Sequence, residues 1–250
     1  MIAERQLGSG QDYAVCGTVG NTRYVGVLDG HGNSRCIDFA RSLDFNEVAA
    51  APDPAIYLHG AVKSIGDTYR SGFTFTFARV TTRSETEFVE VWNVGDSETR
   101  VYLDGKAVYQ TTEHNFLNES EIGRTAHLCT VKAVDAPFPV SEDRIENKLS
   151  PVGQFYTGED LVPSMAFGHN DMTGMAASYW AMKFSGSLRV VCGSDGFFDM
   201  LVPTETGSAD ELADEAARRW QKNWVYFDGK KTQLANFAGA YDDVAVAVLV

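Results

Sequence analysis

The sequence predicts an α+β fold in which two mainly antiparallel β-sheets pack face to face, with helices on the outside. Two observations lead to this expectation. Along the chain, a group of strands is followed by two helices, more strands, one further helix and a final strand, an order typical of sheets covered by helices. Most connections between strands are too short to hold a crossover helix, which argues against a parallel, doubly wound sheet.

In the N-terminal half, the sequence pattern predicts a hairpin, two helices and a series of strands. Residues 12–19 and 23–29 have the pattern of paired strands around a Gly-Asn turn. Apolar residues at helical spacing predict a helix over 34–46, and a second helix is expected to open near Pro54. Alternating or short apolar runs predict further strands over 73–77, 86–94, 98–103 and 106–110.

The C-terminal half is less regular. We expect a short helix from Ser120 to Ala126, and then an irregular, flap-like region over about 135–180, where prolines and glycines interrupt the pattern. Strands are predicted over 187–193 and 243–250. The clearest helix lies between them, from Ser208 to Asn223, because Ser208 is a suitable N-cap and acidic residues fill the first turn.

The length suits one large globular domain or two small ones, and we interpret residues 1–250 as a single domain, since no linker or internal repeat divides them. The chain has 250 residues, 44% of them hydrophobic, which suffices for a large core. Its net charge of −13 argues against non-specific nucleic-acid binding, which needs a basic face. We expect no nucleic-acid partner and a monomer.

Cysteine usage and hydropathy indicate a soluble, cytoplasmic protein. The four cysteines show no CxxC spacing, so a zinc site is not expected and a reducing compartment is favoured. The N-terminus lacks the apolar stretch of a signal peptide. No apolar run approaches the roughly 20 residues that a membrane span needs, so we expect no membrane association.

Aspartates stand at the ends of several predicted strands. Asp29 follows an apolar run and opens the sequence Asp-Gly-His-Gly, and Asp96 and Asp195 follow two later runs. Asp12 and Asp242 each precede a run. If these strand ends meet, the carboxylates repel one another unless cations neutralise them. The pattern therefore predicts a metal site, and oxygen ligands favour Mg²⁺ or Mn²⁺ over zinc.

A plain turn is the alternative for each aspartate, since Asp-Gly is a common hairpin signal. Asp104-Gly105 lies between two short strands and predicts such a hairpin. Asp29-Gly30 differs because a helix-like segment follows it. For Asp96 the turn interpretation is as good as the metal one.

The order of these motifs resembles that of the metal-dependent serine/threonine phosphatases of the PP2C type (the PPM family). The likeness spans nearly the whole chain. The segments that carry it are Asp29-Gly30-His31-Gly32, Gly95-Asp96-Ser97, Ser194-Asp195-Gly196 and Asp242-Asp243-Val244, with lesser matches at Ser71-Gly72-Phe73-Thr74, Thr111-Thr112-Glu113-His114 and Ser164-Met165-Ala166-Phe167-Gly168-His169.

The resemblance implies a four-layer αββα sandwich and a metal-dependent phosphomonoesterase. Such an enzyme dephosphorylates phosphoserine and phosphothreonine in proteins by attack of a water that bridges two Mg²⁺ or Mn²⁺ ions. By resemblance, Asp29 bridges both ions and Gly30 offers its carbonyl to one of them. Asp195 and Asp242 bind the other ion, although Asp243 competes with Asp242 for that place.

The remaining site residues are also implied by the resemblance. Asp12 accepts hydrogen bonds from metal-bound waters without contacting an ion itself. Asp96 forms a weaker third metal site together with Asp195. His31 is the candidate general acid for the leaving alkoxide, or else a residue that only orients Asp29. The other four histidines are expected to be structural or to lie on the surface, with His114 orienting a neighbouring loop.

One departure concerns the substrate phosphate. The family usually has an arginine five residues before the position of Asp12, where this chain has Leu7, and Gln11 replaces the acidic residue before Asp12. Arg5 is the nearest candidate to bind phosphate in its place. Two alternatives stay open: a catalytically weak or inactive regulatory module of this fold, and a phosphatase of small phosphorylated molecules.

Overall fold

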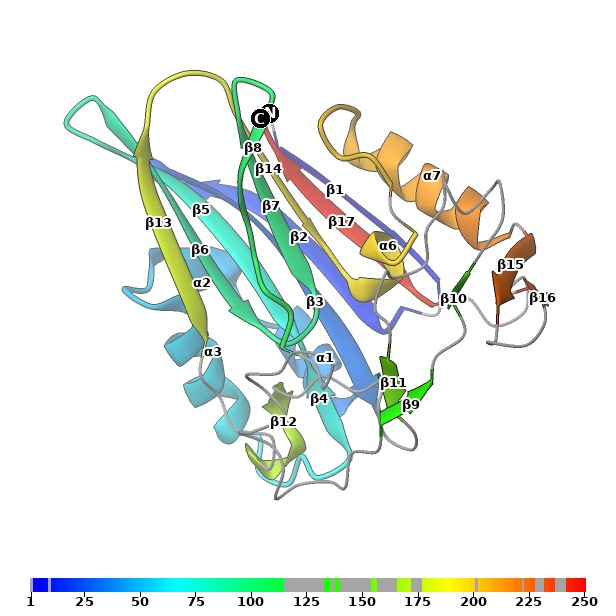
Figure 1. Cartoon of the computed structure of the whole chain (residues 1–250). Coiled ribbons are helices and arrows are strands. Elements are labelled where there is room, and N and C mark those ends of the chain that lie inside the picture. Colours follow the sequence, from blue (N-terminus) through cyan, green and yellow to red (C-terminus); the bar gives the residue numbers. More distant parts are fainter. Residues whose placement is uncertain are drawn as a thin grey trace.

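The computed structural model describes most of the chain (Figure 1). The described residues are 2–8, 10–114, 133–135, 138–139, 154–156, 166–171, 177–200, 202–221, 223–227, 232–236 and 242–250. The predicted helix from Ser120 to Ala126 and much of the predicted irregular region over 135–180 lie outside them.

Two antiparallel sheets form the centre of the molecule. In the larger sheet the strand order is β12 (Phe167–Gly168), β4 (Ser71–Phe73), β3 (Thr22–Gly32), β5 (Phe75–Arg83), β6 (Thr86–Val94) and β13 (Ser178–Phe184), and β2 (Asp12–Val19) also pairs with β3. In the smaller sheet the order is β1 (Ile2–Leu7), β17 (Val244–Leu249), β14 (Leu188–Gly193), β7 (Glu98–Leu103) and β8 (Lys106–Gln110). The prediction of two antiparallel sheets is confirmed.

Short strands and helices complete the described residues. Two small sheets contain β10 (Phe138–Pro139), β15 (Asn223–Phe227) and β16 (Thr232–Asn236), and β9 (Ala133–Asp135) with β11 (Gln154–Tyr156). The helices are α1 (Arg35–Arg41), α2 (Phe45–Ala50), α3 (Pro54–Lys63), α6 (Asp195–Phe198) and α7 (Ala209–Trp220), with a 3-10 turn η1 (His169–Asp171). Among the described residues, none of the helices has the length and apolar character needed to cross a bilayer.

Three apolar clusters divide the fold into four layers. One cluster lies between α1–α3 and the larger sheet, and includes Leu28, Phe73 and Phe77. A second fills the space between the two sheets. The third packs α6 and α7 against the smaller sheet. Figure 1 shows the same order, with α2 and α3 on one side and α7 on the other, so the described elements form the expected αββα arrangement.

Local sequence signals account for several boundaries. Ser208 caps α7 in a reciprocal capping box with Glu211. The single helix predicted over 34–46 is instead two helices. The chain leaves the helical conformation before Asp44, whose side chain accepts a hydrogen bond from the backbone N–H of Asn46 and caps α2.

Long-range pairing creates strands that the local pattern did not predict. β1 pairs with the last strand, β17, and β13 pairs with β6, beginning at the end of the region expected to be irregular. β3 continues past Asp29 to Gly32 because its last three residues pair with β4. The Asp-Gly-His-Gly motif is therefore the end of a strand rather than a loop after one.

The alternation of β3 places this motif. Val25 and Val27 point into the inter-sheet core, and Leu28 points to the helices. Because successive side chains alternate across a strand, Asp29 and His31 continue the inter-sheet face. Polar groups therefore occupy one end of the space between the sheets.

Candidate metal centre

Three aspartates from distant parts of the chain converge at this end. Asp29 lies near the end of β3, Asp96 in the connection from β6 to β7, and Asp195 at the first position of α6. One carboxylate oxygen from each lies within 4.8 Å of those of the other two. The structure thus brings together the aspartates that the sequence placed at three strand ends.

Asp12 lies beside Asp29. The two residues are direct partners in the antiparallel ladder of β2 and β3, where like charges destabilise a sheet. Asp12 is 2% exposed, and its Oδ2 atom has no hydrogen-bond partner among the described residues. Burial and the nearby Asp195 carboxylate raise the pKa of Asp12 to about 8. The same causes hold the pKa of Asp29 well above its ordinary value.

The loop that carries Asp96 is held by His114. The imidazole Nδ1 of His114 accepts a hydrogen bond from the Gly95 backbone N–H at 3.1 Å, and the His114 backbone N–H donates to the Gly95 carbonyl at 2.8 Å. The expectation that His114 orients a neighbouring loop is therefore confirmed. Asp96 itself is buried, and this burial together with the Asp195 carboxylate raises its pKa.

Asp195 is held by the start of the last strand. The Ser194 backbone N–H donates to the Ala245 carbonyl, and the Ala245 N–H donates to the Ser194 hydroxyl, both at 3.1 Å. One carboxylate oxygen of Asp195 accepts the Gly196 N–H at 2.6 Å. A side chain at Gly196 would meet the carbonyl of Asp243, so only glycine allows this close approach.

Asp242 and Asp243 have different surroundings. Asp243 is 8% exposed, and its Oδ2 atom accepts the backbone N–H of Gln11 at 2.8 Å, which ties the segment before Asp12 to β17. Asp242 is partly open to solvent. Partial loss of water around its carboxyl, and then the Asp195 carboxylate, raise its pKa to about 6. Asp243 is thus tied to the backbone of the segment before Asp12, and Asp242 stays the predicted ligand.

Two acidic residues extend the cluster and were not predicted as part of the site. Asp199 follows α6 one helical turn after Asp195 and donates its backbone N–H to the Asp195 carbonyl at 2.8 Å. Burial, Asp195 and Glu113 together raise the pKa of Asp199. The Glu113 carboxylate also raises the pKa of Asp96. The spacing of Asp195 and Asp199, four residues apart, was the available signal, because it places both on one helix face.

His31 lies between the backbone of Asp29 and the ring of His169. Its Nδ1 atom lies 3.4 Å from the Asp29 carbonyl, and its ring stacks on that of His169 with the centroids 4.7 Å apart. Burial and the neighbouring His169 lower the pKa of His31 to about 4. At neutral pH the imidazole is therefore uncharged, and this favours the alternative in which His31 orients Asp29. His169, expected to be merely structural, is its direct neighbour.

Arg5 does not lie in the cluster. It pairs with Val246 in the ladder of β1 and β17, and Val246 belongs to the core under α7. The Arg5 guanidinium lies 3.6 Å from Asp210 in the first turn of α7. The prediction that Arg5 binds substrate phosphate is therefore corrected, since its ion pair lies on the helix-covered side of the sheet. Leu7 packs against the same outer core.

Among the comparisons with known proteins, only the comparison with solved structures finds matches to this chain. No protein-family model matches the chain, and no curated protein matches it. Among solved structures, a C. elegans sex-determining protein matches with a TM-score of 0.63 and 15% identity, over 99% of this chain and 64% of that one. This chain therefore spans less than two thirds of that protein.

Two serine/threonine phosphatases match over nearly their whole length. The PPM Ser-Thr phosphatase MsPP from Mycobacterium smegmatis has a TM-score of 0.54 and 17% identity, over 99% of this chain and 97% of that one. The catalytic domain of PstP, solved with 2 manganese ions, has a TM-score of 0.50 and 14% identity, over 99% and 96%. At these identities the likeness establishes the fold, and the chain has the fold of the PPM-type (PP2C-type) serine/threonine phosphatases.

Proposed function

We propose that this protein is a metal-dependent phosphomonoesterase that removes phosphate from phosphoserine and phosphothreonine in proteins. The observation that carries the proposal is the convergence of three carboxylates, from Asp29, Asp96 and Asp195, within 4.8 Å. Together with a phosphatase fold over 99% of the chain, this is the arrangement that metal-assisted phosphate hydrolysis needs.

The donor set fits divalent cations. Asp29, the Gly30 carbonyl, Asp195 and Asp242 would hold two ions, and Asp12 would accept hydrogen bonds from water through Oδ2, which has no other partner among the described residues. Asp96, Asp195 and Asp199 would hold a third ion. All of these donors are oxygens, which favours Mg²⁺ or Mn²⁺. Burial first, and neighbouring carboxylates second, raise the pKa values of Asp12, Asp29 and Asp96, and a bound cation would favour the ionised form of each.

The protein's own residues position the reactants. When bound, the ions neutralise phosphoryl oxygens and acidify a water. Asp29 and Asp195 would hold the ions through their carboxylates. His31 is uncharged at neutral pH and keeps the Asp29 backbone in place through its contact with the Asp29 carbonyl. The general-acid role of His31 stays a proposal that this geometry does not favour.

Two alternatives are tested by the same assay. Leu7 stands where the family has its phosphate-binding arginine and packs under α7, and this observation favours a regulatory module without useful turnover. A phosphatase of small phosphorylated molecules uses the same ions but a different substrate.

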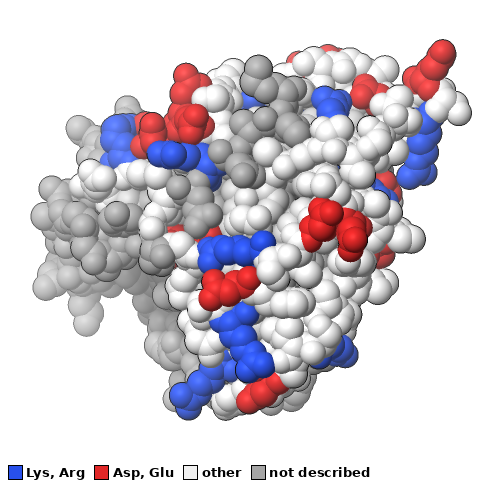
Figure 2. Space-filling view, turned by 180° about the vertical axis from the view of Figure 1, so that it is seen from behind, with Lys and Arg blue, Asp and Glu red and all other residues white. Residues whose placement is uncertain are grey.

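A nucleic-acid partner is not proposed, because basic and acidic side chains of the described residues are interspersed on the face shown in Figure 2.

The test is Mn²⁺-dependent hydrolysis by wild type and by a matched pair of variants. Asp195→Asn and Asp104→Asn make the same change in an Asp-Gly dipeptide. Asp104 lies in a turn between β7 and β8, with φ of 50° there and 75° at Gly105, a turn that Asn-Gly also adopts. We expect Asp195→Asn to lose more than about 100-fold in kcat/KM, because a ligand should matter more than its supporting residues, and Asp104→Asn to match wild type.

The substrate decides among the alternatives. The proposal expects phosphopeptides to be hydrolysed in the presence of Mn²⁺ and EDTA to abolish the activity. Hydrolysis of phosphorylated metabolites in preference to phosphopeptides would replace the protein substrate with a small one. Mn²⁺ binding measured by calorimetry, without turnover of either class, would support the regulatory module instead. Full activity of Asp195→Asn would contradict the assignment of the site.

A further inference from the structure

Helix α6 is too short to hold its own position. It has four residues, with Asp195 at the start and Asp199 as its C-cap. Isolated helices shorter than about 12 residues are marginal in water. The relative position of these two carboxylates must therefore come from contacts that other elements make with residues 195–200.

The last turn of α7 supplies two such contacts. The indole Nε1 of Trp220 donates to the Gly196 carbonyl at 2.7 Å, and Nη1 of Arg219 donates to the Met200 carbonyl at 3.0 Å. Carbonyls at the end of a short helix have no partner within the helix. Trp220 and Arg219 are 8% and 9% exposed, so both hydrogen bonds are largely protected from water.

Arg219 is itself held in place. Its Nε atom donates to Glu215 at 2.6 Å, one helical turn earlier on α7. Hydrogen bonds from Arg218, and then from Arg219, lower the pKa of Glu215 to about 2, so this carboxylate stays ionised at neutral pH. Arg218 makes its ion pair with Glu215 at the surface, whereas Arg219 continues inward to the Met200 carbonyl.

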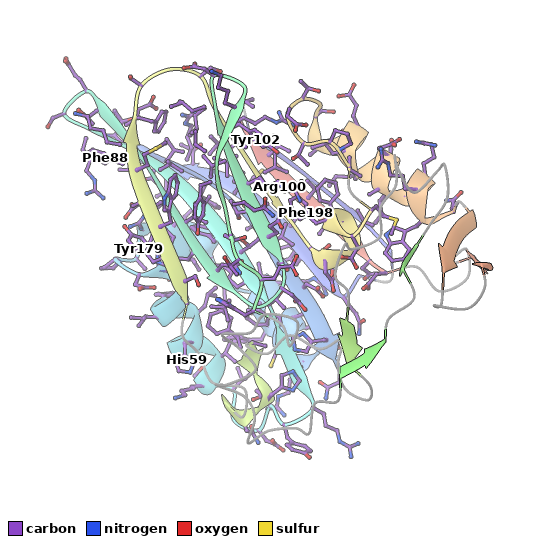
Figure 3. The ribbon with its side chains drawn as sticks, in the orientation of Figure 1. His59, Phe88, Arg100, Tyr102, Tyr179 and Phe198 are labelled. Atoms are coloured by element: carbon purple, nitrogen blue, oxygen red, sulfur yellow. The ribbon has the colours of Figure 1, made fainter. Side chains whose placement is uncertain are left out.

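The opposite side of α6 is also packed. The guanidinium of Arg100, from β7, lies 4.4 Å from the ring centre of Phe198, and the two side chains lie together in Figure 3. Phe197 and Phe198 are buried in the core below α7. Gly196 lies against the backbone of Asp243. The short helix is thus enclosed, and α7 provides the hydrogen-bond donors that face its carbonyls.

We propose that Trp220 and Arg219 are positioning residues that set the geometry of Asp195 and Asp199 for metal binding. The inference rests on the proposed function, in which these carboxylates hold divalent ions. Neither residue touches an ion or a substrate. They act through the backbone on both sides of the ligand-bearing turn, as residues that support metal ligands commonly do.

The first test replaces Trp220 with phenylalanine. Trp220→Phe keeps an aromatic ring in the core but removes the N–H donor together with part of the ring volume. We expect the Kd for Mn²⁺, measured by calorimetry, to rise about 10-fold, and kcat at saturating Mn²⁺ to stay near that of wild type. The control is Trp92→Phe, which makes the same change at a 2%-exposed tryptophan in the core under α1–α3. Its Kd should not change.

The second test uses neighbouring arginines. Arg219→Gln removes the donor to the Met200 carbonyl, and Arg218→Gln removes only the surface ion pair with Glu215. We expect a several-fold rise in the Kd for Mn²⁺ for Arg219→Gln and none for Arg218→Gln. Equal effects of the two arginine variants, or an unchanged Kd in both Trp220→Phe and Arg219→Gln, would overturn the proposal.

A readout without metal separates this inference from the proposed function. In EDTA, amide hydrogen exchange of residues 195–200 should become about fivefold faster in Trp220→Phe, as expected for the loss of one buried hydrogen bond, and stay unchanged in Trp92→Phe. If wild type binds no Mn²⁺, the proposed function fails, together with the metal-binding role of the two residues. If wild type binds Mn²⁺ but neither exchange nor Kd changes in the variants, only the positioning role fails.

Discussion

The two ends of the space between the sheets have opposite chemistry although one strand, β3, lines both. At one end, Val25 and Val27 join a cluster of buried apolar residues that includes Leu249. At the other end, the same face of β3 presents Asp29, which lies opposite Asp12 and close to Asp195. Backbone pairing continues through both ends without interruption.

The comparison shows that the two ends of the space between the sheets are stabilised in different ways. The apolar end is stable in plain water, because burial of hydrocarbon needs no partner from solution. The acidic end gathers carboxylates that repel one another until protons or cations neutralise them. Divalent ions should therefore change what the acidic end contributes to the free energy of unfolding and leave the contribution of the apolar end unchanged.

The largest expected effect comes from Asp29→Asn. The variant should weaken Mn²⁺ binding by more than about 100-fold. In EDTA it should raise the free energy of unfolding, because an amide avoids the cost of burying a carboxyl whose pKa is held well above its ordinary value. Calorimetry measures the first quantity and urea unfolding the second. A variant that is less stable than wild type in EDTA would contradict the view that this end is strained by charge.

Leu249→Ala tests the apolar end. Leu249 is fully buried in the inter-sheet core, and such truncations cost about 2–5 kcal/mol. We expect the same loss of unfolding free energy with EDTA and with saturating Mn²⁺, measured by urea unfolding. A loss that depends strongly on Mn²⁺ would show that the two ends are coupled and would weaken the comparison.

The smallest effect is the pH dependence of the metal-free protein. The folded-state pKa is about 8 for Asp12 and about 6 for Asp242, against 3.8 ordinarily. The folded state therefore binds more protons than the unfolded state between pH 4 and 8, and stability should fall as pH rises through this window.

Unfolding in EDTA measures this dependence. The free energy of unfolding should drop by about 1 kcal/mol between pH 6.5 and 7.5. Saturating Mn²⁺ should reverse the trend, because cations compete with protons for the carboxylates. Metal-free protein that becomes more stable as pH rises over this range would rule out the raised pKa of Asp12.

Local signals in the sequence determined much of the fold. The bounds of β6, β7 and β8 agree with the predicted strands, because alternation and short turns act between neighbouring residues. The Asp104-Gly105 turn and the Ser208 cap are equally local. The aspartates at strand ends were visible for the same reason.

Only the tertiary structure decided which of those residues meet. β1 and β13 exist through pairing with distant strands, and α6 is held by α7. Asp199 lies near Asp195 because α6 carries one at its start and the other at its end. Arg5 lies beside the first turn of α7 because its pairing with Val246 turns that face of β1 toward the helix. The sequence alone determined the local elements and the acidic residue types. Burial and long-range pairing, which no local pattern encodes, decided the geometry and the pKa values of the site.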